Sequence, residues 1–338
     1  MCLYPKLIDN PKYKPNKKNG GIIPPVSDER VKLVPIKCNR CIECRKAIAR
    51  DWQMRLHEEI KKGAKAQFVT LTFNTESIKK LQELEIEKKT RHGVKYKLQI
   101  KELDPYDQDN ALAAKAVRLF LERWRKTTGK SVKHWFITEL GGGKYEHLHL
   151  HGIIWTTANK AFIEDRWQYG HVWAGHEKHG IVVNYVNSQT VNYITKYVHK
   201  VDERHKMYKP AVLSSDGIGK DYVNKHDRRH QYKPKNTIEY YKTPTGHKLA
   251  LPVYFRNKLF TEEEREKLWV EKLDKQIRYV CGEKVSIKDG YQHYDELVKW
   301  HRARNERLGY GNDEKNGDRE QYEKQRRKLL LKRRMQGV

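Results

Sequence analysis

The stretch YEHLHLHGIIW, residues 145–155, most constrains the fold of this chain, because its polar and apolar side chains alternate. Alternation with a period of two is typical of a β-strand that has only one face on a hydrophobic core. The apolar face carries Leu148, Leu150 and Ile154, and the opposite face carries His147, His149 and His151. The sequence therefore predicts a strand that packs by its leucines and presents three imidazoles on the other side.

The histidine face is a candidate metal site. Two imidazoles at alternate positions of a strand can bind one metal ion and leave coordination positions open to a substrate. The preceding strand, VKHWFITEL, is joined to this one through GGGK, so a hairpin would bring Glu139 beside the histidines if the pairing register cooperates. The other interpretation is a row of surface histidines or of cross-strand contacts, because H-x-H alone is a loose pattern.

A second group of reactive side chains lies in VNYITKYVHK, residues 191–200. At about 100° per residue the valines and the isoleucine form one apolar stripe, and Tyr193 and Tyr197 point away from it. Each tyrosine has a lysine three residues later, Lys196 or Lys200, within reach on the helix surface. Phenols beside ammonium groups are candidate nucleophiles toward phosphate. The spacing also allows exposed tyrosines on a nucleic-acid-binding helix.

The other elements follow from periodicity and turn residues. Apolar spacing predicts helices over 42–62, 110–130, 188–200 and 261–277, and strands over 67–74 and 132–140. Thr261 and Glu264 form a capping box at the start of the last of these helices. Residues 75–105 are highly charged and are expected to form an exposed insertion.

Four cysteines occur within the first 44 residues. The stretch CNRCIEC places Cys38, Cys41 and Cys44 at two successive C-x-x-C spacings, which suit thiolate coordination of zinc. Cys2 is the candidate for a fourth ligand if the N-terminal segment folds back. The alternative is three free thiols at the start of a helix. Cys281 stands alone and is expected to be structural.

The charge balance points to a polyanionic partner. The chain of 338 residues has 70 Lys and Arg against 43 Asp and Glu, a formal net charge of +27. Such a surplus attracts nucleic acid, and residues 75–105 and 320–334 are expected to add non-specific affinity. No apolar run approaches the about 20 residues that span a bilayer, and residues 1–20 lack the apolar core of a signal peptide. We therefore expect a cytoplasmic protein with no membrane partner.

Three motifs together resemble a known family. FVTLTF, HLHG and YITKYVHK, in this order, are similar to the three motifs of rolling-circle replication initiators of the HUH endonuclease superfamily. The doubled tyrosine in Y-x-x-K-Y-x-x-K resembles the initiator proteins of microviruses, the small icosahedral single-stranded DNA phages. MCLYPK and CNRCIECRK further resemble the gokushovirus branch. The motif-bearing resemblance covers about residues 1–205.

The resemblance implies a fold and a domain organisation. The family's fold is α+β, a central antiparallel β-sheet with flanking helices. On this chain it implies an N-terminal arm, cysteine cluster and helix over 1–64 and an HUH endonuclease core over 65–205. A basic, mainly helical C-terminal region would then occupy 206–338.

The resemblance also implies metal ligands. His149 and His151 match the family's metal-binding pair, and His147 is an extra histidine, so His147 with His149 is an alternative pair. Glu139 resembles the third metal ligand of related enzymes. The implied catalytic ion is Mg²⁺ or Mn²⁺, which would polarise and orient a scissile phosphate.

Tyr193 and Tyr197 match the family's two nucleophiles, and Lys196 and Lys200 match the associated lysines. The implied reaction is a metal-dependent transesterification on single-stranded DNA at the viral origin. One tyrosine would form a 5′-phosphotyrosine bond and leave a 3′-OH, and the second would cut the regenerated origin so that the ends can be rejoined. The implied partners are single-stranded DNA, the origin region of the replicative-form DNA, and the helicase and DNA polymerase of the bacterial host.

Two other functions remain open from the sequence. A non-catalytic basic DNA-binding or packaging protein would need only the charge, and would not depend on either tyrosine. A zinc hydrolase would use His147, His149 and His151 as a three-histidine site and would form no covalent DNA adduct. The sequence leaves open the origin sequence, which tyrosine cuts first, the physiological metal, the host and the oligomeric state.

Overall fold

The structure is a computed structural model that describes residues 2–90, 92–141, 147–178, 181–226, 229–243 and 246–312. Within these residues the chain divides into two compact units. The sheet unit comprises residues 56–218, and the terminal unit combines residues 2–55 with 219–312. Residues 2–55 and 219–312, which the sequence predicts to belong to separate regions, therefore share one unit.

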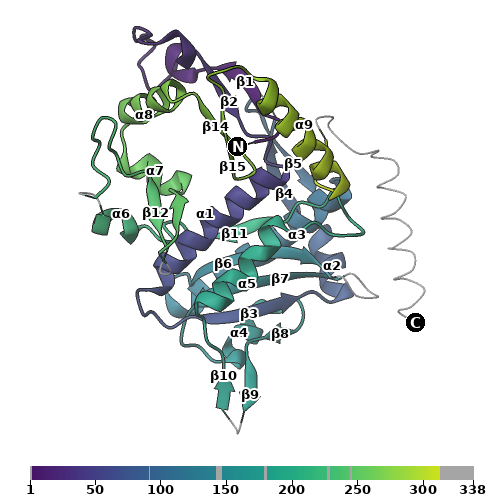
Figure 1. The fold of residues 1–338 in the computed structure, drawn as a ribbon. Helices are drawn as coiled ribbons and strands as arrows, with labels where there is room; N and C mark the ends of the chain where they lie inside the picture. Colours follow the sequence, from purple (N-terminus) through teal and green to yellow (C-terminus); the bar gives the residue numbers. More distant parts are fainter. Residues whose placement is uncertain are drawn as a thin grey trace. The chain divides into compact units, whose positions relative to one another are not determined.

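The sheet unit is built on a five-stranded antiparallel sheet with the strand order β11-β6-β7-β3-β8 (Figure 1). This bears out the α+β class and the central antiparallel sheet. The strands are β3 (Gln67–Thr72), β6 (Lys133–Leu140), β7 (Leu148–Trp155), β8 (Val172–Trp173) and β11 (Val212–Ser214). The helices are α2 (Thr75–Gln82), α3 (Pro105–Thr128), α4 (Lys160–Trp167) and α5 (Ser188–His199), with a 3-10 turn at Ile100–Glu102. Two separate ribbons complete the unit, β4 (Glu85–Lys89) with β5 (Lys95–Gln99), and β9 (His176–Lys178) with β10 (Ile181–Val183).

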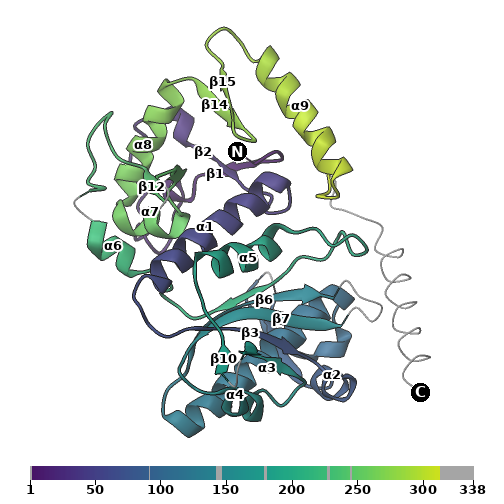
Figure 2. The same ribbon diagram turned by 60° about the horizontal axis from the view of Figure 1, so that its bottom comes forward.

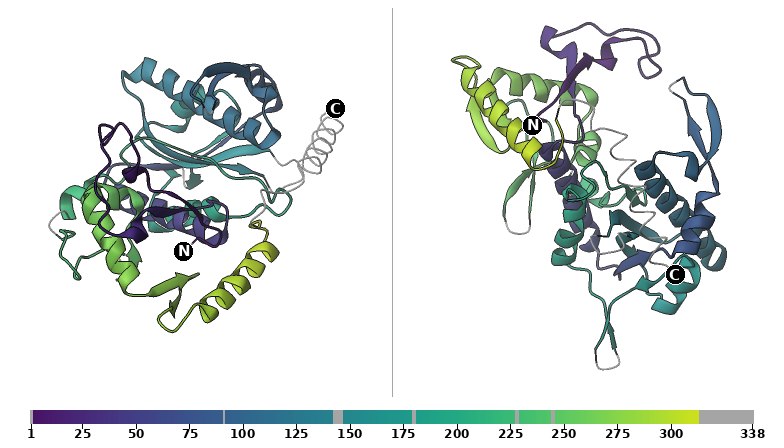
Figure 3. Two further views of the ribbon diagram at one scale, coloured as in Figure 1. Left: turned by 90° about the horizontal axis from the view of Figure 1, so that it is seen from above. Right: turned by 90° about the vertical axis from the view of Figure 1, so that its right-hand side faces the viewer.

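One face of the sheet carries the core of the unit. Leu148, Leu150 and Ile154 of β7 are buried there, as the alternation of the strand predicts. Helix α3 covers this face, and α5 lies on the opposite face of the sheet (Figure 2). The β9–β10 ribbon extends away from the sheet (Figure 3). The sheet therefore separates the apolar face under α3 from the face on which α5 lies. The latter carries Glu139 and the histidines and is called the polar face below, although Trp135, Ile137 and Ile153 on the same face are fully buried.

Helix α5 turns its tyrosines toward the polar face because its other side is apolar. Val191 and Ile194 are fully buried, and Val198 is nearly so, which confirms the predicted stripe. Asn187 caps the helix through the backbone N–H of Thr190, at 3.0 Å, and so fixes the residue at which the helix begins.

Several predicted elements differ from the observed ones, including the helix predicted over 261–277, which ends at Asp274 because Ile277–Val280 forms β14. Helix α3 starts at Pro105 rather than at 110, because proline suits the first turn of a helix. The charged segment 75–105 is not exposed throughout, contrary to the prediction, because it forms α2 and the β4–β5 ribbon, and Leu81 and Ile100 are buried in the core. The histidine strand begins at Leu148, after His147. Residues 142–144 of the GGGK turn and the 320–334 tail lie outside the described residues.

The terminal unit contains short strands and helices from both ends of the chain. They are β1 (Lys6–Asp9), β2 (Leu33–Ile36), α6 (Asp221–His226), β12 (Tyr240–Lys242), β13 (Lys248–Ala250), α7 (Val253–Leu259), α8 (Glu262–Asp274), β14 (Ile277–Val280), β15 (Glu283–Ser286) and α9 (Gln292–Arg307), with 3-10 turns at Pro11–Tyr13 and Glu29–Val31. Helix α1 (Ile42–Ile60) gives residues 42–55 to this unit and 56–60 to the sheet unit. The predicted capping box of Thr261 with Glu264 is present at α8.

Apolar clusters explain why residues 2–55 and 219–312 share a unit. Met54 of α1 is buried among aromatic residues of the C-terminal part, such as Tyr222 and Phe255. A second cluster joins Leu3 and Ile42 to Val280 of β14. Such contacts between sequence-distant residues leave no local signal in the sequence, so the composition of the chain alone did not predict this pairing.

Gly152, which follows the two histidines of β7, is expected to be intolerant of a side chain. A Cβ at this position would lie 2.1 Å from Cδ1 of Phe136 and 2.5 Å from the carbonyl oxygen of Trp135. We expect Gly152→Ala to destabilise the protein by about 1–3 kcal/mol through overpacking, measured as a lower urea midpoint of the near-ultraviolet circular dichroism. The double variant with Phe136→Leu should recover part of the loss relative to Phe136→Leu alone. An unchanged midpoint for Gly152→Ala would contradict the close packing.

Candidate metal and tyrosine site

The register of the central strands gathers a carboxylate and two imidazoles on the polar face. Glu139 of β6 pairs directly with His149 of β7, and Thr70 of β3 pairs with His151. Side chains of directly paired residues point to the same face of a sheet. The pairing of Glu139 with His149 is the register that a metal-binding hairpin requires.

The three side chains converge on one point. The Oε2 atom of Glu139 lies 3.1 Å from Nε2 of His149 and 2.9 Å from Nε2 of His151, and the two Nε2 atoms are 3.1 Å apart. Their side chains are only 11–18% exposed. One carboxylate oxygen and two imidazole nitrogens form a mixed donor set that suits a divalent cation such as Mn²⁺. The donor set and its spacing thus fit a bound metal ion.

Neighbouring groups orient both imidazoles toward this point. Nδ1 of His149 donates to the backbone carbonyl of His147 at 2.9 Å, which leaves Nε2 as the ring nitrogen that faces Glu139. Nδ1 of His151 lies 3.0 Å from the Thr70 hydroxyl. Hydrogen bonds to the far ring nitrogen are the usual support of metal-binding histidines.

The protonation states also suit a cation. Burial alone would raise the pKa of the Glu139 carboxyl, but hydrogen bonds from His149, His151 and Lys200 outweigh it, and the pKa lies well below its ordinary value of 4.5. Burial lowers the pKa of His151 below 6.5, so this imidazole is neutral at neutral pH. An ionised carboxylate beside a neutral imidazole needs little proton loss before it can bind a metal.

Both tyrosines of α5 lie against His151, one of the candidate metal ligands. The Tyr197 ring stacks on His151, with 4.6 Å between centroids and 22° between planes. The Tyr197 hydroxyl donates to the Tyr193 hydroxyl at 2.6 Å. Burial, the hydrogen bond to Tyr193 and the charge of Glu139 all raise the pKa of Tyr197. Two phenolic oxygens are therefore held as a pair beside the same cluster, and Tyr193 is 46% exposed and open to a ligand.

The two lysines of the motif occupy different positions. Nζ of Lys200 lies 2.7 Å from Oε1 of Glu139 and 5.5 Å from the centroid of the Tyr197 ring. The ion pair with Glu139 raises the pKa of Lys200, so its charge persists in alkaline solution. The Lys196 side chain is exposed, and no contact among the described residues joins it to the carboxylate and histidines. A small pocket that is partly open to solvent is lined by Glu139, Tyr197 and Lys200, among other residues.

His147 is not part of the converging group. Among the described residues, the group that can bind a metal at this place consists of Glu139, His149 and His151. His147 precedes β7, and its backbone carbonyl, rather than its ring, supports His149. Of the two histidine pairs that the sequence leaves open, the structure brings together His149 and His151.

Three residues near the site were not singled out from the sequence. Thr70 supports His151, and Phe68 lies on the same face of β3, stacked at 6.0 Å from the His151 ring. Trp173 of β8 lies opposite Thr70 in the strand pairing. The rings of Trp173 and Phe68 form a T-shaped contact with 5.5 Å between their centroids. The alternation of FVTLTF places Phe68 and Thr70 on one face, but only the register across three strands shows that this is the histidine face.

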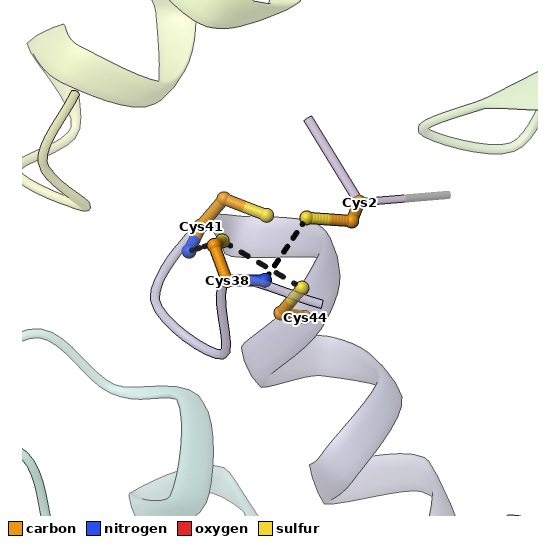
Figure 4. Close-up of side chains that lie close together, drawn as sticks. All are labelled: Cys2, Cys38, Cys41 and Cys44. Carbon is orange, nitrogen blue, oxygen red and sulfur yellow. Dashed lines mark hydrogen bonds between the residues drawn. The ribbon is translucent and has the colours of Figure 1, made fainter. Parts of the chain in front are cut away.

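The four N-terminal cysteines meet in the terminal unit (Figure 4). Cys2 folds back to Cys38, Cys41 and Cys44, and all four sulfur atoms lie within 4.8 Å of one another. They form a second group that can bind a metal ion. Cys281 packs beside this cluster as a half-buried core residue and is not one of its members.

No family model matches the chain, and neither a curated protein nor a solved structure is significantly similar to it. Of the helices that the structure describes, none has both the length and the apolar character to cross a bilayer.

Mn²⁺ binding should separate His147 from the converging histidines. We expect His149→Ala and His151→Ala each to weaken Mn²⁺ binding by more than about tenfold, because each removes a ligand, whereas His147→Ala keeps the backbone carbonyl and should bind Mn²⁺ almost as wild type does. Isothermal titration of the full chain measures the affinities, and the thiol cluster is expected to bind Mn²⁺ poorly because thiolates are soft ligands. Equal losses for all three variants would instead support a three-histidine site.

Proposed function

We propose that the sheet unit is a metal-dependent endonuclease that cuts and rejoins single-stranded DNA through a tyrosine. The observation that carries the proposal is the contact of the Tyr197 ring with His151, which places a candidate nucleophile from α5 against a metal-binding group on β6 and β7. The sequence motifs that resemble HUH replication initiators supply the substrate class. On this proposal the protein starts rolling-circle replication of a microvirus-like genome in the bacterial cytoplasm, together with the helicase and polymerase of the host.

The metal ligands would be Glu139, His149 and His151. The bound Mg²⁺ or Mn²⁺ would polarise the scissile phosphate and help to offset the negative charge that develops on it. Lys200 adds a persistent positive charge beside Glu139 and the Tyr197 ring. Opposite charges fixed before the reaction stabilise a developing anion at little cost in reorganisation.

The tyrosine reaction exchanges one phosphodiester bond for another. The phenolic oxygen forms a bond to phosphorus, and the bond from phosphorus to the 3′-oxygen breaks and leaves its electron pair on that oxygen. The phenol gives up its proton, and the 3′-oxygen takes one up. The products are a 5′-phosphotyrosine and a 3′-OH, and the reverse reaction rejoins the strand without a nucleotide cofactor.

The pair of tyrosines suits consecutive reactions at one metal site. The two phenolic oxygens are 2.6 Å apart, so either can approach the same phosphate with a small rotation of its side chain. While one tyrosine holds a DNA end, the other is free to attack a second phosphate. A single nucleophile would have to release the first end before it could cut again.

An aromatic strip beside the metal ligands provides a surface for bases. Phe68 contacts the rings of His151, Tyr193 and Trp173, and Trp173 contacts the ring of His176. Aromatic side chains bind unpaired bases by stacking, and Lys and Arg hold the backbone. The net charge of +27 supports the same substrate.

The decisive experiment detects a covalent adduct. Wild type, Tyr193→Phe, Tyr197→Phe and the double variant are each incubated with a labelled single-stranded DNA library that has a random central region, with Mn²⁺, with Mg²⁺ or with EDTA. We expect a labelled band at the size of the protein on a denaturing gel, absent in EDTA and in the double variant. The single variants then show which tyrosine cuts first.

Two results would overturn the proposal. DNA binding without an adduct in either metal would favour the non-catalytic DNA-binding protein. Metal-dependent cleavage that survives in the double tyrosine variant would favour a metallohydrolase. Tyr185→Phe is the matched control, because this tyrosine is 75% exposed just before α5 and is expected to keep full adduct formation.

The aromatic strip predicts a specific loss of affinity. We expect Trp173→Ala to weaken binding of single-stranded DNA by about 1–3 kcal/mol, and Trp173→Phe to keep most of the affinity, because stacking needs a ring but not an indole. Fluorescence anisotropy in EDTA measures binding without cleavage. Binding of wild type should also weaken steeply as salt rises. Equal affinities for Trp173→Ala and wild type would show that the bases bind elsewhere.

A further inference from the structure

We propose that Cys2, Cys38, Cys41 and Cys44 bind one Zn²⁺ ion in a tetrahedral four-thiolate site that holds the terminal unit together. The site is independent of the endonuclease proposal, because it lies in the other unit and uses other ligands. Its role is structural: four protein ligands fill the coordination of zinc and leave no position for a substrate.

The sulfur positions fit a tetrahedral centre. Sulfur atoms that each lie about 2.3 Å from a zinc ion stand about 3.8 Å from one another. Sγ of Cys38 lies 3.8 Å from Sγ of Cys44, and all four sulfur atoms lie within 4.8 Å of one another. This spacing is far longer than a disulfide bond of about 2.05 Å, and all of the cysteines are free thiols.

Backbone N–H groups surround the sulfur atoms as they do around bound thiolates. The amides of Arg40 and Cys41 donate to Sγ of Cys38 at 3.5 and 3.3 Å. The amide of Cys38 donates to Sγ of Cys2 at 3.3 Å, and that of Leu3 donates to Sγ of Cys41 at 3.5 Å. Hydrogen bonds to the ionised form of a thiol stabilise it. They also orient the sulfur atoms toward a common centre.

The backbone of residues 38–44 has a conformation that brings their cysteines together. Asn39 has a φ of +57°, in the left-handed region that asparagine tolerates better than most residues, and it bends the chain between Cys38 and Cys41. Helix α1 then begins at Ile42, so Cys44 lies in its first turn, where the helix dipole favours a thiolate. Figure 4 shows Cys38 and Cys41 on the loop before this helix and Cys2 on a separate segment.

The surroundings explain what the ion would stabilise. Cys2, Cys41 and Cys44 are core residues of a small cluster with Leu3, Tyr4, Ile42 and Val280. Arg302 of α9 donates to the carbonyl of Leu3 at 2.9 Å. A small apolar cluster gives limited stability, and a metal ion that joins the N-terminal segment to residues 38–44 compensates for it. Four thiolates select zinc over harder ions such as Mg²⁺ or Mn²⁺.

The experiment measures metal content and thiol reactivity in the full chain. Protein is produced in medium that contains both zinc and iron, and the metals are quantified by mass spectrometry. We expect one zinc per chain in wild type and in the double variant His149→Ala with His151→Ala, which removes the other metal-binding group. Replacement by Co²⁺ should give the ligand-field bands of a tetrahedral four-thiolate centre.

Cys281→Ser is the matched control, because Cys281 packs against the same cluster without being a ligand. It should keep one zinc, whereas Cys38→Ser should lose it. Since Cys38→Ser can also unfold the unit, alkylation of native wild type provides a second measurement: Cys2, Cys38, Cys41 and Cys44 should be protected until a chelator removes zinc. Iron in place of zinc, disulfides among the four cysteines, or their rapid alkylation without a chelator would each overturn the proposal.

Discussion

The register between β6 and β7 is the constraint on which the candidate active site depends. It sets Glu139 opposite His149, and the adjoining register of β3 sets Thr70 opposite His151. A shift of one residue would turn Glu139 into the apolar core and separate it from both imidazoles. The register is held from the other face of the sheet, where Leu148 and Leu150 are buried, and where Gly152 makes room for Phe136.

The dependence on pairing register also explains how much of the candidate site could be predicted from the sequence alone. Strict alternation was enough to predict which face of β7 carries His149 and His151, and helical spacing was enough to predict that Tyr193 and Tyr197 share a face. The sequence did not determine the pairing register, so the position of Glu139 stayed conditional. Contacts between distant strands could not be predicted from the sequence. The residues of β8 give no sign that Trp173 lies opposite Thr70 of β3, which in turn lies opposite His151 of β7.

For the cysteines, too, the sequence predicted one part of the site, and long-range contacts determine the other part. The two C-x-x-C spacings predicted that Cys38, Cys41 and Cys44 can share one ion, because the backbone between them is too short to separate them. The approach of Cys2 depends on how residues 3–37 fold, and that course is set by contacts with the C-terminal part of the chain. The same contacts place both ends of the chain in one unit, which composition did not predict.

The two candidate metal-binding groups differ in a way that matches their proposed roles. Glu139, His149 and His151 provide three ligands, and a cation bound there keeps open positions for a phosphate. Four thiolates surround an ion completely and favour its permanent retention. On this account the terminal unit uses a metal for folding, and the sheet unit uses a metal for chemistry.

The most direct test of the central claim locates the nucleotide on the protein. Trypsin cleaves after Lys196, so Tyr193 and Tyr197 fall in different peptides, residues 179–196 and 197–200. After incubation with single-stranded DNA and Mn²⁺, the adduct is trimmed with a nuclease, digested and analysed by tandem mass spectrometry. We expect a nucleotide phosphate on the phenolic oxygen of Tyr193 or Tyr197. A nucleotide on any other residue, or cleaved DNA without modified peptide, would contradict it.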